Sequence, residues 1–431
     1  GENGPGFSLM ESSEIGISFR NDLDARKGAA NRVLFNGSGV AVGDVNGDGL
    51  PDLFFCGIDS PNQFYRNLGQ WKFERVTIPT SLETLGAASR GAVFADLNGN
   101  DRLDLLVSTI GMGVRVFWNQ GEFSFQDATQ EFGTETQYGA TSMALADVDG
   151  NGTLDLYVAN YRSNDIRDFA RVPVKRVGGK MVPSDELQDR IFIHEGQIHE
   201  YGEPDILYLN DGLGKMTPVD WSSGVFRENG RALSEAPKDW GLSVMLRDFS
   251  GDGSPDLYVC NDYWTPDRVW INDGHGGFDA LPADALNVSS ASSMGVDGTD
   301  VDGDGNIDLF VVDMLSRNPE LRKSQQASES MVANIPSLNG PRFQVNYNTM
   351  LLGGGNGRFT DISHFAGLEA SDWSWCPIFM DVDLDGIDDV LISAGYPHDM
   401  QDSDTLRLIQ SRQHSWDRYA SDDARQQAFA N

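Results

Sequence analysis

The chain has 431 residues, more than the roughly 250–300 at which a single hydrophobic core stops growing, so several domains or a repeat are required. Its 65 acidic and 32 basic residues leave a formal charge of −33, which argues against nucleic acid and anionic lipid as partners because both are bound through clustered Lys and Arg. No run of about 18 apolar residues is present to span a bilayer. The three scattered cysteines, Cys56, Cys260 and Cys376, are expected to be buried thiols.

The first predicted element is the segment GFSLMESSEIG at 6–16, which resembles RFTDISHFAG at 358–367 and therefore the last quarter of a longer module. From Asp44 onward, one string occurs six times: Asp-x-(Asp/Asn/Ser)-x-(Asp/Asn)-x-x-x-Asp, followed by an apolar run. Successive copies start 52, 51, 101, 52 and 81 residues apart. The basic period is therefore about 50 residues, with extra residues in two places.

Each module predicts four short strands. An apolar segment precedes the acidic string and another follows it; five modules then add a segment with a glycine turn, such as FYRNLG or VWINDG, and a last segment such as KFERVT. Four antiparallel strands per period of about 50 residues are typical of a propeller blade, whereas tandem β-sandwiches need about 100 residues per domain. We expect an all-β fold, a β-propeller over residues 1–403 with inserted loops at 161–205 and 313–347.

The last module stops after its first two strands. The following residues, 404–431, contain an amphipathic pattern that predicts a C-terminal helical segment rather than the missing strands. A seven-bladed propeller, with the helix leading to a further blade, is favoured over six blades with a defective last one.

The acidic strings predict calcium loops. Positions 1, 3, 5 and 9 supply side-chain oxygens, position 7 supplies a backbone carbonyl, and position 6 is glycine in five of the six loops. Such a set suits Ca²⁺, a hard cation that takes six to eight oxygen ligands. In order of position, the candidate ligands are Asp44, Asn46, Asp48, Leu50 and Asp52; Asp96, Asn98, Asn100, Arg102 and Asp104; Asp147, Asp149, Asn151, Thr153 and Asp155; Asp248, Ser250, Asp252, Ser254 and Asp256; Asp300, Asp302, Asp304, Asn306 and Asp308; and Asp381, Asp383, Asp385, Ile387 and Asp389.

Two other structures could explain the acidic strings: an EF-hand and a turn without a metal. An EF-hand needs a glutamate at position 12, where these loops have Phe55, Val107, Val158, Val259, Val311 and Ile392. Turns without a metal would explain one Asp/Asn/Gly-rich loop, but they do not explain six in phase. The Asp96 loop is expected to be the weakest site because position 6 is Asp101 and only two of its ligands are charged.

These loops and flanking strings such as NGSGVAVGDVNGDGLPDLFF resemble the calcium-binding FG-GAP/VCBS repeats of integrin-α-like propellers. Among these, the sequence is most similar to secreted bacterial VCBS proteins related to cartilage acidic protein, over about Phe7 to Asp404. The resemblance implies several calcium ions, up to six, an extracellular or cell-surface location (periplasm or outer surface in a bacterium), and roles in binding and adhesion. It specifies no ligand.

Both insertions follow the second strand of their modules, so we expect them on the face opposite the acidic loops, where a long loop can bind a partner. The first insertion is basic between Arg162 and Lys180. The predicted partner contacts, with a glycan or another extracellular subunit, are Arg167, Arg171, Lys175 and Arg176, together with Trp264. Lineage-specific decoration is the alternative for the insertions.

A non-catalytic, calcium-stabilised interaction protein is the expected function, and no catalytic residue is assigned. A carbohydrate-active propeller enzyme, a polysaccharide lyase or glycosidase, is the alternative. A lyase needs a base grouped with arginines, and the first insertion contains suitable residues: Arg162, Arg167, Arg171, Lys175, Arg176, Lys180, His194, His199 and Tyr201.

Overall fold

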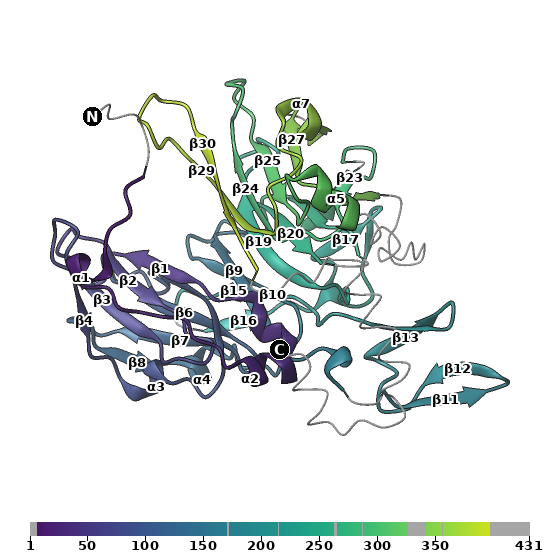
Figure 1. Ribbon diagram of the computed structural model, residues 1–431, viewed down its shortest axis with the longest axis horizontal. Coiled ribbons are helices and arrows are strands. Elements are labelled where there is room, and N and C mark those ends of the chain that lie inside the picture. Colours follow the sequence, from purple (N-terminus) through teal and green to yellow (C-terminus); the bar gives the residue numbers. More distant parts are fainter. Residues whose placement is uncertain are drawn as a thin grey trace. The chain divides into compact units, whose positions relative to one another are not determined.

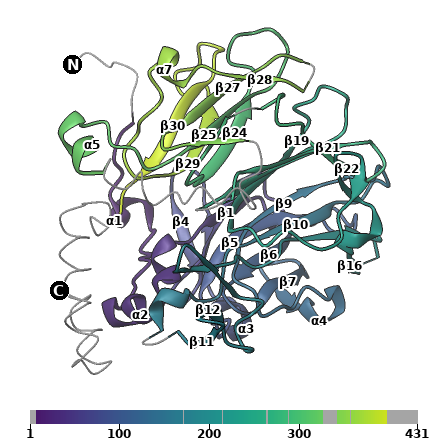
Figure 2. The ribbon, with the colours of Figure 1, turned by 90° about the vertical axis from the view of Figure 1, so that its right-hand side faces the viewer.

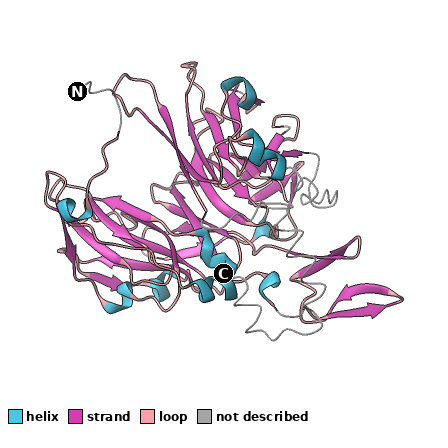
Figure 3. Cartoon of the chain, in the orientation of Figure 1, coloured by secondary structure: helices cyan, strands magenta, loops and turns pink. Residues whose placement is uncertain are grey.

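The computed structural model describes residues 7–169, 172–213, 215–262, 265–286, 288–325, 342–355 and 357–396. Strands dominate these residues and the helices are short (Figure 3). The described residues form two compact units, Phe7–Val219 and Asp220–Tyr396. The expected all-β class is confirmed.

The first unit contains three four-stranded antiparallel sheets, drawn in purple to teal in Figure 1. In each sheet the strands follow one another in chain order. The sheets are β1 (Val40–Gly43), β2 (Asp52–Phe55), β3 (Gln63–Asn67) and β4 (Phe73–Val76); β5 (Ser89–Ala95), β6 (Asp104–Thr109), β7 (Gly113–Asn119) and β8 (Phe125–Asp127); and β9 (Ala140–Ala146), β10 (Asp155–Asn160), β15 (Ile206–Asn210) and β16 (Met216–Pro218). The helices of this unit are α1 (Ser12–Ile15), α2 (Ala25–Ala30), η1 (Arg32–Asn36), α3 (Thr80–Glu83) and α4 (Thr129–Phe132).

The insertion at 161–205, expected as a loop, contains η2 (Ile166–Asp168) and two β-hairpins. The first pairs β11 (Val174–Val177) with β12 (Lys180–Pro183), and the second pairs β13 (Ile191–His194) with β14 (Gln197–Glu200). Tight glycine turns explain both: Gly178 and Gly179 join the first pair and Gly196 turns the second, all at positive φ. Figure 1 labels β11 and β12 of the first hairpin and β13 of the second.

The second unit repeats the four-stranded pattern twice and then begins a third sheet. Its sheets are β19 (Gly241–Arg247), β20 (Asp256–Asn261), β21 (Arg268–Asn272) and β22 (Phe278–Ala280), widened by β17 (Phe226–Glu228) and β18 (Arg231–Ala232); β24 (Gly295–Thr299), β25 (Asp308–Val312), β27 (Thr349–Gly353) and β28 (Phe359–Asp361); the pair β29 (Ser374–Met380) and β30 (Asp389–Ala394); and the short parallel pair β23 (Val288–Ser290) and β26 (Phe343–Val345). The helices are η3 (Trp221–Ser223), α5 (Pro319–Gln325) and α7 (Ser363–Ala366). Figure 2 shows β24, β25 and β27 with the β29–β30 hairpin.

The core lies between neighbouring sheets, because the second strand of a sheet is apolar on both faces. Leu105 and Leu106 of β6 are both fully buried, yet they belong to different clusters. Leu105 packs with Phe54 and Phe64 of the first sheet, and Leu106 packs with Leu156 of the third. Since successive strand residues point to opposite faces, a run such as DLLV places one residue in each interface.

The cysteine prediction holds at two positions and is wrong at the third. Cys56 and Cys260 are buried free thiols, whereas Cys376 is exposed. Cys376 lies on β29, whose sheet has only two strands among the described residues, so part of the cover that the other sheets have is absent there. The predicted C-terminal helical segment, 404–431, lies outside the described residues.

Candidate metal sites

All six acidic loops join the first strand of a sheet to its second. In every loop, position 1 directly follows the first strand, and position 9 is the first residue of the second strand. The loops therefore occupy the same end of every sheet, as the repeat predicted.

The position-1 aspartate organises the loop backbone. The carboxylate of Asp300 accepts hydrogen bonds from the backbone N–H groups of positions 4, 5 and 6, at 2.8, 3.1 and 2.9 Å. The bond from position 6 recurs in all six loops, at 2.8–2.9 Å. This arrangement turns the loop around one carboxylate and brings positions 3 and 5 toward it.

The position-9 aspartate fastens the loop to the sheet. One oxygen of Asp256 accepts from the N–H of Phe249 at position 2 (3.1 Å), and the other accepts from the N–H of Asn272 at the end of the third strand (2.9 Å). The same pair of bonds forms in the first five loops. In those five loops the aspartate is at most 1% exposed.

Burial makes these carboxylates costly to ionise in the absence of a cation. It raises the pKa of Asp104 and of Asp155 to about 6, and the neighbouring Asp147 and Asp149 add to the effect at Asp155. It also raises the pKa of Asp52, Asp256 and Asp308. A bound cation favours the charged form of a nearby carboxylate, so the donor set fits a divalent ion.

In three loops the carboxylates converge. Ligand oxygens lie within 4.8 Å of one another in the triads Asp147, Asp149 and Asp155; Asp300, Asp302 and Asp304; and Asp381, Asp383 and Asp385. In the Asp44 loop, Asp48 instead contacts Asn46 (2.8 Å) and Arg66 (3.1 Å), which lowers its pKa. Among the described residues, three loops thus each bring three carboxylates close together.

Two loops carry a strained residue where the others have glycine. Position 6 has positive φ throughout, and Asp101 adopts it at 63°. Position 4 also has positive φ in all six loops, and Leu384 takes 61° where its five counterparts are glycine. A left-handed conformation costs a residue with a Cβ about 1–2 kcal/mol. The sequence predicts a weaker loop from Asp101 at position 6, but no prediction was made from Leu384 at position 4.

The third-strand asparagine is a site residue that the sequence reasoning missed. Asn119 donates its backbone N–H to Asp104, and its side chain donates to the carbonyls of Leu103 (3.0 Å) and of Val45 in the preceding loop (2.9 Å). Asn210 repeats this with Asp155, Leu154 and Leu97. The recurring Asn-x-Gly was the available signal, but it had been assigned only to a turn.

Some of the predicted partner-binding residues of the first insertion form ion pairs with acidic residues of the same insertion. Arg167 forms an ion pair with Asp165, and Lys175 forms one with Asp185. Arg176 is exposed, while Arg171 and Trp264 lie outside the described residues. Two of the four predicted cations therefore have local acidic partners.

Two of the basic residues that a polysaccharide lyase would need make structural contacts instead. Arg162 is nearly buried and pairs with Glu200 (3.0 Å) and Glu203 (3.6 Å). His199 is buried and stacks on Phe192, with 5.1 Å between ring centroids, and burial lowers its pKa. Both groups therefore make structural contacts at the β13–β14 hairpin.

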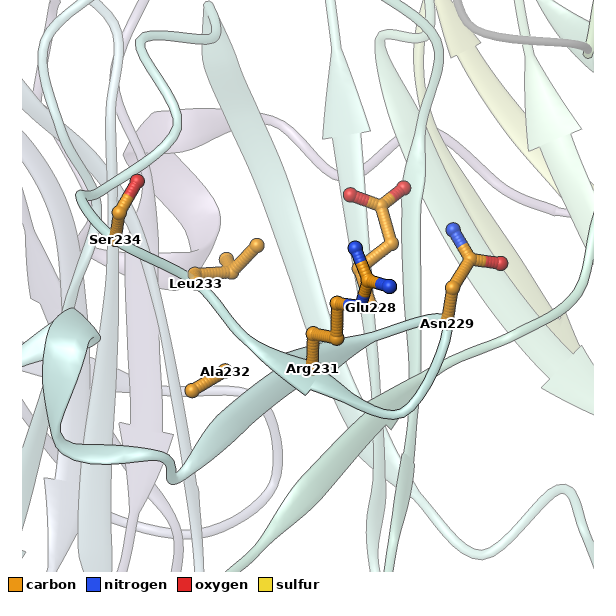
Figure 4. Close-up of a pocket in the computed structure, with 6 residues that line it drawn as sticks. All are labelled: Glu228, Asn229, Arg231, Ala232, Leu233 and Ser234. Atoms are coloured by element: carbon orange, nitrogen blue, oxygen red, sulfur yellow. The ribbon is translucent and has the colours of Figure 1, made fainter.

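A shallow depression of about 500 Å³ lies beside the turn that joins β17 to β18 (Figure 4). Its lining comes from one short segment: Glu228, Asn229, Arg231, Ala232, Leu233 and Ser234. It gathers no groups from distant parts of the chain, so we assign it no ligand.

Comparison with protein families matches residues 44–107, 107–158 and 248–311 to the FG-GAP-like repeat. The chain contains FG-GAP-like repeats. The matched segments include five of the six acidic loops, those that begin at Asp44, Asp96, Asp147, Asp248 and Asp300. The FG-GAP part of the predicted repeat type is confirmed for these segments.

The chain is also similar to cartilage acidic protein 1. It is 23% identical to the mouse protein over 276 residues, which are 62% of this chain and 35% of the mouse protein. It is 26% identical to the Xenopus tropicalis protein over 182 residues, 40% of this chain and 28% of that one. The chain thus spans about a third of the length of these relatives.

Two solved structures share weaker likeness. A lectin from Agrocybe aegerita that recognises non-reducing terminal N-acetylglucosamine has a TM-score of 0.33 and 17% identity, over 74% of this chain and 77% of the lectin. The Vibrio cholerae biofilm matrix protein Bap1 has a TM-score of 0.24 and 11% identity, over 83% and 59% of the two chains. With TM-scores this low, neither is a guide to the ligand of this chain.

Among the described residues, no helix has the length and apolarity to cross a membrane.

Proposed function

We propose that this protein is a calcium-stabilised extracellular binding or scaffold protein whose repeated sheets are blades of a β-propeller, seven-bladed as the repeat pattern favours. The observation that carries the calcium proposal is the repetition of one loop architecture, with buried position-9 carboxylates and three convergent acidic triads. The FG-GAP-like repeats and the similarity to cartilage acidic protein 1 support the extracellular binding role.

In this proposal Ca²⁺ binds through the oxygens at positions 1, 3, 5, 7 and 9, and its role is to offset repulsion among the loop carboxylates. At about 4 Å, two unit charges repel by roughly 4 kcal/mol at an effective dielectric constant near 20. The cation thereby holds the loops closed and fixes the ends of the strands on which they lie.

The partner is proposed to be a glycan or another extracellular protein, bound without chemical change. Some of the basic residues that a lyase would need already form ion pairs within the chain, as Arg162 does with Glu200. A glycan array run beside a digestion screen of the same polysaccharides tests the proposal. Calcium-dependent retention without depolymerisation is expected, and release of shortened or unsaturated products would contradict the non-catalytic role.

A further inference from the structure

Hydrogen bonds through one asparagine connect the first two acidic loops. In chain order, the loops occupy residues 44–52, 96–104, 147–155, 248–256, 300–308 and 381–389. Asn119 donates its backbone N–H to Asp104, the position-9 carboxylate of the second loop, at 2.9 Å. Its side-chain Nδ2 donates to the carbonyl of Val45, at position 2 of the first loop, at 2.9 Å. The N–H of Val45 in turn donates to Asp52, the position-9 carboxylate of the first loop, at 3.2 Å. Asn119 and Val45 therefore link the position-9 carboxylates of both loops.

Asn210 makes the same connection between the second and third loops. Its backbone N–H donates to Asp155 at position 9 of the third loop (2.8 Å), and its Nδ2 donates to the carbonyl of Leu97 at position 2 of the second loop (3.0 Å). The N–H of Leu97 donates to Asp104 at 3.3 Å. The carbonyl of Asn210 also accepts a hydrogen bond from Oγ1 of Thr153, the position-7 residue of the third loop, at 2.9 Å. An unbroken series of hydrogen bonds thus runs through the first three loops.

Both connecting side chains are buried, and each of their polar atoms is hydrogen-bonded. Asn119 and Asn210 are at most 2% exposed. Each Nδ2 makes a second bond, to the position-8 carbonyl of its own loop at 3.0 Å, and each Oδ1 accepts the N–H of the glycine two residues later at 2.8–2.9 Å. Because an unsatisfied buried polar group is destabilising, each asparagine favours the arrangement in which both of its loops are closed.

The second unit contains a neighbouring pair of loops without this connection. Gly353 occupies the third-strand position of the fifth loop and donates its backbone N–H to Asp308 at 2.7 Å, as the asparagines do to their own position-9 carboxylates. It has no side chain to reach the fourth loop. A Cβ at this position would lie 2.3 Å from the carbonyl oxygen of Ile307, so the backbone leaves no room for an asparagine. The fourth and fifth loops therefore provide a natural control for the first three.

We propose that Asn119 and Asn210 couple calcium binding in neighbouring loops, so that occupancy of one loop raises the affinity of the loop before it. This inference rests on the proposed calcium function. When Asp155 is fixed by a cation in the third loop, Asn210 is held with it, and its side chain keeps Leu97 in the closed position of the second loop. The second loop then has less conformational freedom left to lose on binding its own ion. The effect is reciprocal, because linkage requires each site to change the other by the same factor.

Hydrogen–deuterium exchange of the full chain, resolved by peptide in mass spectrometry, measures each loop separately. The amides of the second loop should become protected as calcium is added, and the measured quantity is the calcium concentration at half-protection. Asp149→Ala removes a carboxylate from the third loop, while Asp147 and Asp155 keep their bonds to the backbone. This change should raise the half-protection concentration of the second loop about two- to tenfold, the range that one net hydrogen bond supports. No shift in the second loop would overturn the proposal.

Asp302→Ala is the matched control, because it removes the position-3 carboxylate of the fifth loop. Since Gly353 offers no side chain, the half-protection concentration of the fourth loop should stay unchanged. An equal shift in the fourth loop would show that charge alone carries the effect, and it would refute the coupling role of the asparagines. Both variants leave the asparagines in place, so this comparison does not depend on whether an asparagine variant folds.

Asn210→Ala tests the connecting side chain itself. At calcium concentrations that still protect its third loop, the second loop should need about two- to tenfold more calcium than in the wild type, because Leu97 is no longer held. Asp149→Ala should then add no further shift. A merely structural asparagine would weaken the third loop alone, and that result, or a further shift of the wild-type size, would refute the proposal.

Calcium bound per chain, quantified in parallel by mass spectrometry, separates two kinds of failure. Bound calcium without the shift in the second loop would refute the coupling alone. A folded chain that binds no calcium would refute the proposed function and the coupling with it.

Discussion

Replacement of the strained leucine at position 4 of the last loop should stabilise the protein. Leu384 has φ of 61°, and its side chain is 87% exposed, so Leu384→Gly removes strain and almost no buried contact. Relief of the left-handed conformation is worth about 1–2 kcal/mol. Glycine also has greater conformational freedom in the unfolded chain, which lowers the free energy of unfolding by about 0.5–1 kcal/mol. The expected net gain is about 0.5–1 kcal/mol.

The matched control makes the reverse change at the same position of the preceding loop. Gly303 has φ of 77°, and a Cβ added there would meet no atom within 4 Å. Gly303→Ala therefore introduces strain without a clash and should cost about the same 0.5–1 kcal/mol by the same two effects.

Urea unfolding at saturating calcium, followed by tryptophan fluorescence, measures both changes. Trp373 and Trp375 lie at the start of β29, so they report on the sheet that contains Leu384. A decrease in stability for Leu384→Gly, or an increase for Gly303→Ala, would refute the assignment of backbone strain to position 4.

Three further predictions concern the cation and the buried acids. Removal of divalent ions with EDTA should lower the melting temperature, and Ca²⁺ should restore it better than Mg²⁺, because each site at 100-fold excess over Kd contributes about 2.7 kcal/mol; an unchanged melt would argue against structural calcium. Asp302→Ala should cost more calcium-dependent stability in calorimetry than Asn98→Ala, because the Asp300 loop has a convergent acidic triad; the reverse order would show that charge does not rank the sites. Burial raises the pKa of Asp267 to about 6, so the stability that its protonation contributes is present below about pH 4 and is lost as pH rises through 6. The stability of Asp267→Asn relative to the wild type should therefore increase between pH 4 and 6, and a flat difference would contradict that pKa.

The repeated strands and loops were predictable from the sequence because their determinants are local. Nine residues contain the whole acidic string, and the apolar run that follows determines the second strand. The burial of Leu105 and Leu106 on opposite faces also follows from such a run once neighbouring sheets are assumed.

The contacts that complete the site join residues distant in sequence. Asn210 reaches Asp155 across the whole 161–205 insertion; the recurring Asn-x-Gly marks the asparagine, but it does not show which carboxylate the asparagine meets. The ion pair between Arg167 and Asp165 lies within one short turn, yet sequence counts only the charges and does not show that their side chains meet. The two hairpins of the insertion were missed because their strands are only four residues long and lie outside the repeated module.

Calcium stoichiometry is the most direct measurement of whether the six loops are metal sites. The chain is dialysed to equilibrium against buffered calcium, and bound metal is quantified by mass spectrometry for the wild type and for Asp302→Ala. The proposal predicts several calcium ions per chain, up to six, with one fewer in the variant. Calcium no higher in the protein chamber than in the buffer, in a chain that remains folded, would contradict it.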